Sequence, residues 1–181
     1  IVKTRFILLG LLCAANLAHA DLSGKDRERK HNYIDEGPWK EQELALPAFG
    51  AWDWVELDKP VTIKGQLFID RQTLRLADDR TVRFSLLQLS SSGIENISHE
   101  GVHCAERTQR SYAYGDSVNK RWIESKRTEW RKLDRNHLAM KTVVQALCPD
   151  NTPPLTAEEL QANLAKASRA APPPKIEPIR K

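Results

Sequence analysis

Apolar and polar side chains alternate with a period of two along the middle of this chain, and this alternation constrains its fold more than any other feature. It runs over residues 61–70 and returns over 74–76 and 82–86. A period of two places one side of a segment in a core and the other in a polar environment, as in a half-buried β-strand. Only short polar turns separate these segments, so crossover helices have no room and neighbouring strands run antiparallel. The pattern predicts an antiparallel β-meander.

Weaker patterns predict the later part of the meander. After Leu86 the parity slips to Leu87 and Leu89. Such a slip indicates either a β-bulge or a central strand that is buried on both faces. Residues 97–104 form a further expected strand, and another strand is expected to end near 112–115.

Helices are expected to close the fold after the meander. Apolar residues spaced three and four apart predict an amphipathic helix over 136–147, and a capping box of Thr156 and Glu159 starts another that reaches about Ser168. A short helix that carries Trp122, capped by Asp116 or Ser117, is also expected. The predicted fold class is α+β, a single domain over 38–168 in which an antiparallel β-meander is packed by C-terminal helices.

The first twenty residues have the pattern of a cleaved export signal. Lys3 and Arg5 precede an apolar run over 6–15, which is too short for the roughly 20 apolar residues of a membrane-spanning helix. Ala18 and Ala20 form the small-x-small pattern of a signal-peptidase site, so we expect residues 1–20 to be removed by cleavage between Ala20 and Asp21. This predicts a periplasmic protein without a transmembrane span. Leu12 stands before Cys13 where lipidation needs a small residue, which argues against a lipoprotein anchor.

Two polar segments flank the predicted domain. Residues 21–37 are highly charged and are expected to be mobile, and the tail over 169–181 contains a run of three prolines and is expected to be disordered. Without Lys3 and Arg5, 26 basic residues face 24 acidic ones, a net charge of +2. This small excess, together with export, argues against a nucleic-acid partner.

The chain that follows the predicted cleavage keeps two cysteines, Cys104 and Cys148. An even pair in an oxidising compartment predicts a disulfide. Closing a loop of this length stabilises a fold by about 4 kcal/mol on the chain-entropy model. A catalytic thiol is not expected, because the sequence has no C-x-x-C pair.

One segment resembles a catalytic motif. Residues 99–103 match the H-E-x-x-H pattern, in which two His one helical turn apart hold zinc and the Glu activates the bound water. Gly101 and the Ser-rich stretch before the motif disfavour a helix. In a strand, the Cα atoms of the two His would be roughly 13 Å apart. We therefore expect no metal, cofactor or catalytic residue here, and a zinc hydrolase using His99, Glu100 and His103 is the alternative function.

Aromatic residues mark two further regions. Residues 39–54 hold three of the five Trp and are interrupted by Pro and Gly, so we expect an extended strap that packs on the domain. Trp52 and Trp54 alternate, which places both on one strand face and makes a small-ligand or glycan site there another alternative. Residues 107–135 mix basic, acidic and aromatic side chains. Because positive and negative charges are mixed, the segment favours a solvated, salt-bridged helix face over a binding surface. Only a weak contact with anionic envelope surfaces is expected.

Several short blocks resemble a known family in the order in which they occur. They are Trp39-Lys40-Glu41, Leu46-Pro47-Ala48-Phe49, Phe68-Ile69-Asp70, residues 82–86, residues 91–104, Tyr112-Ala113-Tyr114-Gly115, Trp122, Trp130 and Leu147-Cys148-Pro149. Over roughly residues 38–150 the chain resembles the CNP1-like family of exported proteins of Gram-negative bacteria, mostly betaproteobacteria. Some of its members look like lipoproteins, a pattern from which this chain departs at Leu12-Cys13.

The resemblance implies that the protein is exported to the cell envelope, but it does not imply a reaction or a ligand. It supports the Cys104–Cys148 disulfide. In the family pattern an aromatic and a basic residue stand where this chain has His99 and His103, so the resemblance weakens the zinc hypothesis. We therefore expect a non-catalytic binding or scaffolding module of the cell envelope, with an unknown envelope partner.

Overall fold

The computed structural model describes residues 38–134 and 136–169. The predicted signal peptide with its Ala20/Asp21 cleavage site, Cys13 and the segment 21–37 lie outside these residues, as does the predicted Pro-rich tail apart from Arg169. Within the described residues, no helix has the length and apolar character needed to cross a membrane.

Over these residues the chain forms one antiparallel eight-stranded sheet, which confirms the predicted meander. Its main path runs in the order β1-β2-β4-β5-β6-β7, while β3 pairs with β4 and β8 pairs with β6. The strands are β1 (Trp54–Glu56), β2 (Gln66–Asp70), β3 (Arg75–Leu76), β4 (Val82–Leu89), β5 (Glu95–His103), β6 (Thr108–Asp116), β7 (Arg121–Glu124) and β8 (Arg131–Lys132).

The first predicted strand is shorter than expected. The alternation predicts a start near Val61, but β2 begins at Gln66, and Val61 is 90% exposed in the preceding turn. Gly65 explains the late start. It has a φ of +77°, and a Cβ at this position would collide with the backbone carbonyl of Leu89. A positive φ and a close backbone approach both favour glycine over any other residue.

The expected helix around Trp122 is wrong, because Trp122 lies in strand β7. Asp116 does act as a local cap, but it caps a turn. Its Oδ1 accepts a hydrogen bond from the backbone N–H of Asn119 at 3.1 Å, and Lys120 adopts a φ of +52°. This turn joins β6 and β7 as a hairpin, so the salt-bridged helix face expected within 107–135 is also wrong.

The parity slip after Leu86 has a clear cause. Every residue of β4 from Val82 to Leu87 is buried, so β4 is a central strand covered on both faces. Of the two alternatives, this one is correct for β4. A bulge exists elsewhere, between β5 and β6, where the register shifts between His99 and Glu100.

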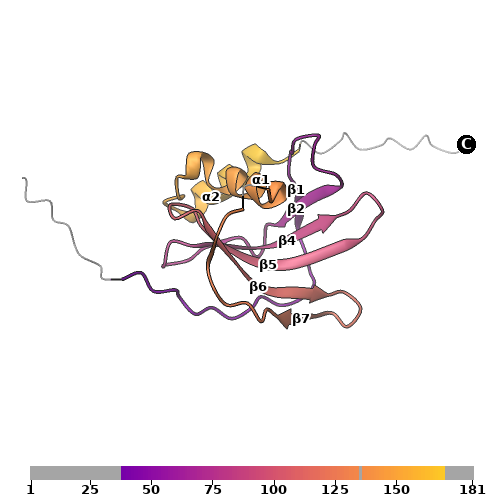
Figure 1. The fold of residues 1–181 in the computed structure, drawn as a ribbon, viewed down its shortest axis with the longest axis horizontal. Coiled ribbons are helices and arrows are strands. Elements are labelled where there is room, and N and C mark those ends of the chain that lie inside the picture. Colours follow the sequence, from indigo (N-terminus) through magenta and orange to yellow (C-terminus); the bar gives the residue numbers. More distant parts are fainter. Residues whose placement is uncertain (1–37, 135, 170–181) are drawn as a thin grey trace, which may run out of the picture. The chain divides into compact units, whose positions relative to one another are not determined.

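In the described part of the chain, two α-helices follow the sheet: α1 (Leu138–Leu147) and α2 (Ala157–Ala167), with a 3₁₀ turn (Pro149–Asn151) between them. The predicted capping box is confirmed. Thr156 Oγ1 accepts a hydrogen bond from the Glu159 N–H at 3.1 Å, and the Glu159 carboxylate accepts one from the Leu155 N–H at 2.8 Å. Both helices lie on the same side of the sheet, near β1 and β2 (Figure 1).

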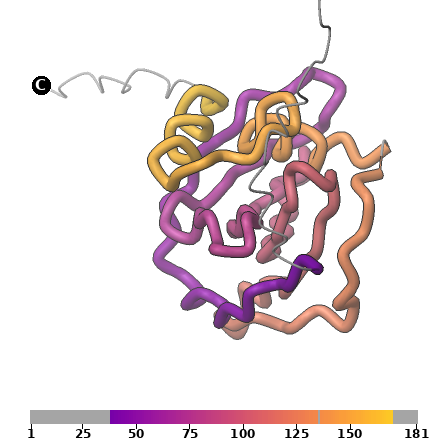
Figure 2. The backbone as a smooth tube through the Cα atoms, turned by 90° about the vertical axis from the view of Figure 1, so that its left-hand side faces the viewer, coloured from indigo at the N-terminus to yellow at the C-terminus, as the bar shows by residue number. Residues whose placement is uncertain are grey.

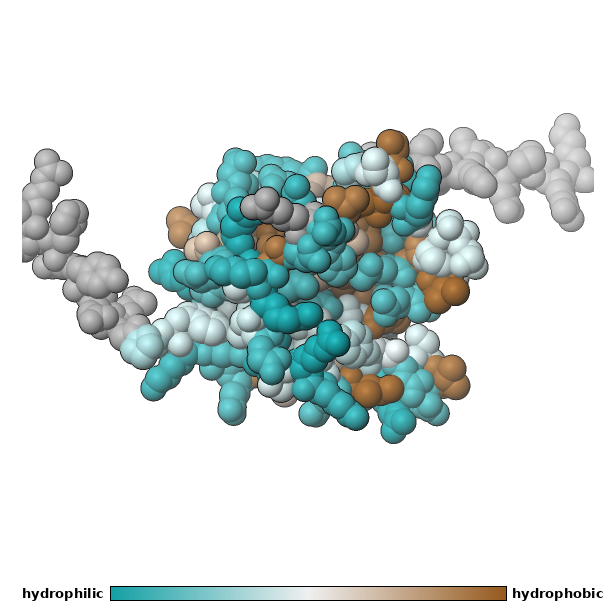
Figure 3. Space-filling model, viewed as in Figure 1, coloured by the Kyte–Doolittle hydropathy of each residue, from teal (hydrophilic) through white to brown (hydrophobic). Residues whose placement is uncertain are grey.

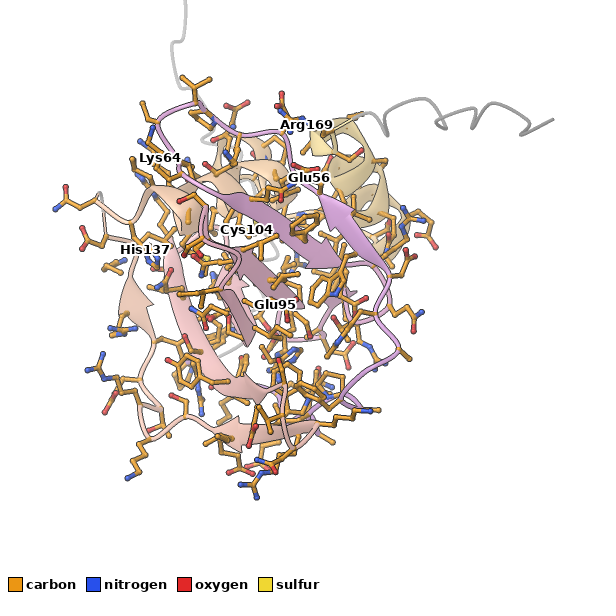
Figure 4. The ribbon with its side chains drawn as sticks, turned by 90° about the vertical axis from the view of Figure 1, so that its right-hand side faces the viewer. Glu56, Lys64, Glu95, Cys104, His137 and Arg169 are labelled. Carbon is orange, nitrogen blue, oxygen red and sulfur yellow. A yellow bond between two sulfur atoms is a disulfide. The ribbon has the colours of Figure 1, made fainter. Side chains whose placement is uncertain are left out.

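The apolar core lies between these helices and the sheet. Phe84, Leu86 and Val102 of the sheet are fully buried with Val143 and Leu147 of α1 and with Leu160 and Leu164 of α2. The predicted disulfide is confirmed here: Cys104 follows β5, Cys148 ends α1, and their Cα atoms are 5.9 Å apart. Figure 4 shows Cys104 in the interior. The bond therefore ties the helix layer to the centre of the sheet.

The opposite face of the sheet is covered by residues 38–53, which we call the strap. The strap forms no helix or strand, as predicted, and passes β6 and β7 before it enters β1 (Figure 1). In a view turned by 90°, the helices and the strap lie on opposite sides of the sheet (Figure 2).

The chain returns to the sheet after α2. Ser168 forms a β-bridge with Leu57, and the Arg169 guanidinium lies 3.1 Å from the Glu56 carboxylate. Figure 4 shows Glu56 and Arg169 side by side. These contacts fasten the end of α2 to the edge strand β1.

Candidate functional site

Strand β5 carries the H-E-x-x-H residues, and it presents them to opposite faces of the sheet. His99 pairs with Ser85 and faces the strap, where its ring centroid is 5.9 Å from that of Trp122. Glu100 pairs with Phe84 and faces the helix side, where its carboxylate accepts a hydrogen bond from Ser111 Oγ at 2.8 Å. The predicted strand is confirmed, and the sheet separates Glu100 from both His.

The two His also have separate neighbours on the strap side. His103 packs edge-on against Trp39 at 5.4 Å between ring centroids, while His99 Nδ1 lies 3.3 Å from Ser85 Oγ. Over residues 38–134 and 136–169, no group of three or more His, Cys, Asp or Glu is placed to hold a metal ion. The helical arrangement on which the zinc hypothesis depends is therefore not formed by this segment.

One carboxylate of the strap, Glu41, bonds to several side chains of the sheet. Glu41 accepts hydrogen bonds from the Tyr112 hydroxyl at 2.7 Å and from Trp130 Nε1 at 2.9 Å, and it forms an ion pair with Arg110. The Arg83 guanidinium lies 3.8 Å away. These partners come from β4, β6 and the segment before β8, so Glu41 links the strap to three parts of the sheet.

The Trp52 and Trp54 rings lie side by side, with centroids 5.1 Å apart, as their spacing predicts. Both belong to an aromatic cluster with Phe49 and Trp122, in which neighbouring centroids are 5.1–5.8 Å apart. Trp122 Nε1 also donates a hydrogen bond to the carbonyl of Pro47 at 2.8 Å. The rings are thus used to pack the strap on β7, which supports the predicted strap.

Along β5, the side chains on the helix side of the sheet change from apolar to polar. Val102 lies under the helices, but Glu100, Ser98 and Asn96 follow on the same face and are polar. Their cross-strand neighbours Gln88, Ser111 and Tyr114 are polar as well. Because the helices do not cover this end of the sheet, the polar side chains form the floor of an open cleft.

This cleft, which we call the Glu100 cleft, has a volume of about 470 Å³. Ligand pockets commonly have volumes of about 300–1,000 Å³. Its rim comes from β8, from the segment that follows it and from the first turn of α1. The lining residues are Gln88, Asn96, Ser98, Glu100, Gln109, Ser111, Tyr114, Arg131, Lys132, Asp134, His137 and Met140. Figure 4 shows His137 at the edge of the folded body.

The floor of the Glu100 cleft holds buried polar groups. Glu100 is 4% exposed and Gln109 is 7% exposed. The side-chain oxygen of Gln109 has no hydrogen-bond partner among the described residues. A buried acceptor without a partner costs about 1–3 kcal/mol, so this oxygen favours a donor that enters the cleft.

Two neighbouring residues in β5 have strongly shifted pKa values. Burial raises the pKa of Glu100 to about 7, although hydrogen bonds from Ser111 and Ser98 and the charge of Arg131 oppose the shift. Burial lowers the pKa of His99 to about 4, and the charges of Arg83 and Arg75 act in the same direction. His99 is therefore neutral at neutral pH, and Glu100 is partly protonated.

A second hollow, of about 460 Å³, lies between the turn before β2 and the helices. Its lining includes Pro60, Ile63, Leu138 and Ala146, and none of its polar side chains is buried. It therefore lacks the fixed polar groups that give a site its specificity.

Sequence reasoning did not find the Glu100 cleft. No local motif marks Gln109, Ser111 or Arg131 within 107–135, and the only motif that contains Glu100 is the metal-binding one. A signal was present, because Asn96, Ser98 and Glu100 share the parity of Val102 and so place polar residues on an inward face. Recognising this signal required the register between β4, β5 and β6.

Comparison with known proteins places these features in a family. The model of the CNP1-like family matches residues 34–165. The chain is also similar to "Cryptic neisserial protein 1" of Neisseria gonorrhoeae (strain ATCC 700825 / FA 1090), with 27% identity over 153 residues, which cover 74% of this chain and 75% of that protein. No solved structure matches the chain. The family match spans the strap, the sheet, the whole of α1 and most of α2, and the chain therefore belongs to the CNP1-like family.

Proposed function

We propose that this protein is a non-catalytic binding module of the periplasm and that the Glu100 cleft is its binding site. The observation that carries the proposal is the cleft floor, where Glu100 and the unpartnered oxygen of Gln109 are buried at the base of an open hollow. Buried polar groups that converge in a cavity are typical of ligand sites.

The disulfide supports the proposed compartment. Cys104 and Cys148 are both fully buried and bonded. Structural disulfides persist in oxidising compartments such as the periplasm and are rare in the cytosol. The export signal predicted over residues 1–20 leads to the same compartment.

The surface supports a small polar ligand over a large apolar partner. The most exposed apolar side chains, Val61, Ile94, Val118 and Leu155, lie in four separate turns. Hydrophilic side chains cover most of the face seen in Figure 3, and hydrophobic ones form small separate patches. Binding sites for large apolar partners are usually continuous apolar patches of several hundred Å².

The placement of Glu100 supports binding over zinc hydrolysis. A hydrolytic H-E-x-x-H site needs the Glu beside the water that the two His hold on zinc. Here the Glu100 carboxylate bonds to Ser111 on one face, and His99 and His103 contact Trp122 and Trp39 on the other. Elemental analysis of protein purified without chelator tests this alternative, since stoichiometric zinc that is lost in a His99→Ala/His103→Ala variant would favour the hydrolase.

The binding proposal is tested by thermal shift against sugars, muropeptides and lipid headgroups from the envelope. Asn96→Trp places a large ring in the cleft from an exposed position, and Glu95→Trp places the same ring on the opposite face of β5 as a matched control. We expect at least one component to raise the melting temperature of the wild type and of Glu95→Trp but not of Asn96→Trp. Equal shifts in both variants would show that the ligand binds elsewhere.

The proposed compartment has its own test. Osmotic release of periplasmic contents should recover the protein with Cys104 and Cys148 oxidised. Recovery of the whole pool in the cytosolic fraction, with both thiols free, would contradict export.

A further inference from the structure

We propose that the Glu100 cleft takes a sugar acid, whose carboxylate pairs with Arg131 and whose hydroxyl groups bond to Glu100 and Gln109. This inference rests on the proposed function, and it adds the chemical class of the ligand. It follows from three properties of the cleft: the hydrogen-bonding groups of its floor, the charge of its rim and its size.

The floor requires a ligand that donates and accepts hydrogen bonds. Gln109 offers a buried carbonyl oxygen that has no partner within the described residues, so it needs an O–H or N–H donor. Glu100 accepts a hydrogen bond from Ser111 with one oxygen, and when its carboxyl is protonated it can also donate. A hydroxyl group both donates and accepts, so neighbouring hydroxyls of one ring match both side chains.

The rim can bind an anion through Arg131. Arg131 and Lys132 of β8 line the cleft together with Asp134 and His137. Lys132 is engaged, because its Nζ donates to the Glu106 carbonyl at 2.9 Å and lies 3.7 Å from the Glu106 carboxylate. Arg131 has no carboxylate within 4.0 Å in the part of the chain that the structure describes. A guanidinium without an ion pair binds a carboxylate in a bidentate geometry.

The size of the cleft fits a single sugar ring. Its volume of about 470 Å³ is near the lower end of the range for small-molecule sites. Tyr114, which is 42% exposed, lies at its side and offers a ring edge or face to the apolar side of a pyranose.

The inference predicts a pH dependence of binding. The charged and titratable groups that face Glu100 are Arg131 and Lys132 from β8, and Asp134 and His137 from the segment before α1. None of the other lining residues from β4, β5 and β6 carries a carboxyl, imidazole, amino or guanidinium group. The raised pKa of Glu100 means that its carboxyl loses a proton near neutral pH. Because a charged Glu100 repels an anion, affinity should fall as pH rises.

The test is calorimetric titration of the full chain, with its disulfide intact, at constant ionic strength. The probes are D-glucuronate, D-glucose as the same ring without the charge, and propionate as a carboxylate without the ring. We expect glucuronate to bind at least roughly tenfold more tightly than either control, and to weaken several-fold from about pH 5.5 to about pH 8. Equal affinities for glucuronate and for either control would overturn the inference.

Four variants assign the contacts. Arg131→Gln should weaken glucuronate binding at least roughly tenfold, whereas Lys126→Gln, an exposed change outside the cleft, should leave it unchanged. Glu100→Gln should still bind glucuronate but lose most of the pH dependence. If His137→Gln removes the pH dependence and Glu100→Gln retains it, the proposed role of Glu100 is wrong.

A further probe separates failure of this inference from failure of the proposed function. D-Glucosamine at about pH 6 carries an ammonium group on the same ring. If it binds in the cleft and glucuronate does not, the ligand class is wrong and the binding module remains. If none of the probes binds and no envelope component gives a shift that Asn96→Trp removes, both proposals fall.

Discussion

The two faces of the sheet are closed in different ways. On the helix side, Phe84, Leu86 and Val102 are fully buried against α1 and α2, and a disulfide fixes that layer. On the strap side, the Glu41 carboxylate, hydrogen bonds of Gln42 with Asp79 and Arg83, and a cluster of aromatic rings hold a segment without regular structure. Apolar burial does not depend on protonation, whereas a charged contact does. The comparison predicts that the helix layer is robust and the strap contact conditional, and the experiments below test the two faces separately.

Removal of the disulfide should have the largest effect, because it loosens the robust face. Cys104 and Cys148 are 44 positions apart in the sequence, and for a loop of this length the chain-entropy model gives a loss of about 4 kcal/mol in the free energy of unfolding. Reduction, verified by thiol labelling, should therefore lower the melting temperature strongly, and the Cys104→Ser/Cys148→Ser variant should match the reduced wild type. An unchanged melting temperature would mean that apolar packing alone fixes the helix layer.

The next largest effect concerns pH and compares two neighbouring residues on opposite faces. His99 has a pKa of about 4 in the fold against an ordinary value of 6.5, so the unfolded chain binds more protons between these values. Stability from His99 is therefore lost as pH falls from about 6.5 to about 4. Glu100 has a pKa of about 7 against an ordinary value of 4.5, so its contribution is lost as pH rises through that window.

Each shift corresponds to about 3 kcal/mol over its window, and the two effects oppose each other between about pH 4.5 and about pH 6.5. Unfolding of the wild type, His99→Gln and Glu100→Gln should be measured by denaturant titration at several pH values. Relative to the wild type, His99→Gln should lose stability as pH rises, and Glu100→Gln should gain it. If the free energy of unfolding changed with pH in the same way in both variants, the opposite pKa shifts of His99 and Glu100 would be contradicted.

Loss of the strap carboxylate should have a smaller and more local effect. Glu41→Gln removes the ion pair with Arg110 and weakens the acceptor of Tyr112 and Trp130. Because the Glu41 side chain is 20% exposed, we expect a loss of about 2 kcal/mol, below that of a fully buried pair. Hydrogen exchange should increase in residues 38–53 and leave α1 and α2 protected.

Glu43→Gln is the matched control for this experiment, because Glu43 lies in the same segment and is exposed. It should change neither stability nor exchange. If Glu41→Gln raises exchange in the helices as much as in the strap, the two faces form one cooperative unit and the distinction between them is wrong.

How much the sequence predicts differs between the two faces for a physical reason. The helix side follows local patterns, since the capping box at Thr156, the apolar spacing of α1 and the pair of cysteines are all readable along the chain. The strap contacts join Glu41 to residues 69, 71 and 89 positions away, and no local pattern encodes such pairs. The Glu100 cleft falls between these cases. The alternation along β5 places polar residues on the inward face, but only the pairing of β5 with β4 and β6 shows which residues lie together.

The short helix expected around Trp122 failed for a related reason. Asp116 favours a helix start and a turn equally well, because its side chain bonds to a backbone N–H a few residues ahead in both. Pairing of Tyr114 with Ile123 and of Gly115 with Trp122 decides the outcome. Tertiary contacts thus override a weak local preference at the edge of the sheet.

The smallest expected effect concerns the aromatic part of the strap contact. Trp122→Phe keeps an aromatic ring beside Phe49 and Trp52 but removes the hydrogen bond from Nε1 to the Pro47 carbonyl. One such bond contributes about 1 kcal/mol, so the free energy of unfolding should fall by about that amount. Trp122→Ala also removes the ring and should cost more, measured by the same denaturant titration. If both variants lose the same stability, the ring contributes nothing and the hydrogen bond alone holds this end of the strap. A larger loss in Trp122→Ala would show that the strap side, like the helix side, depends on apolar burial, in addition to the charged contact of Glu41 and the buried His99.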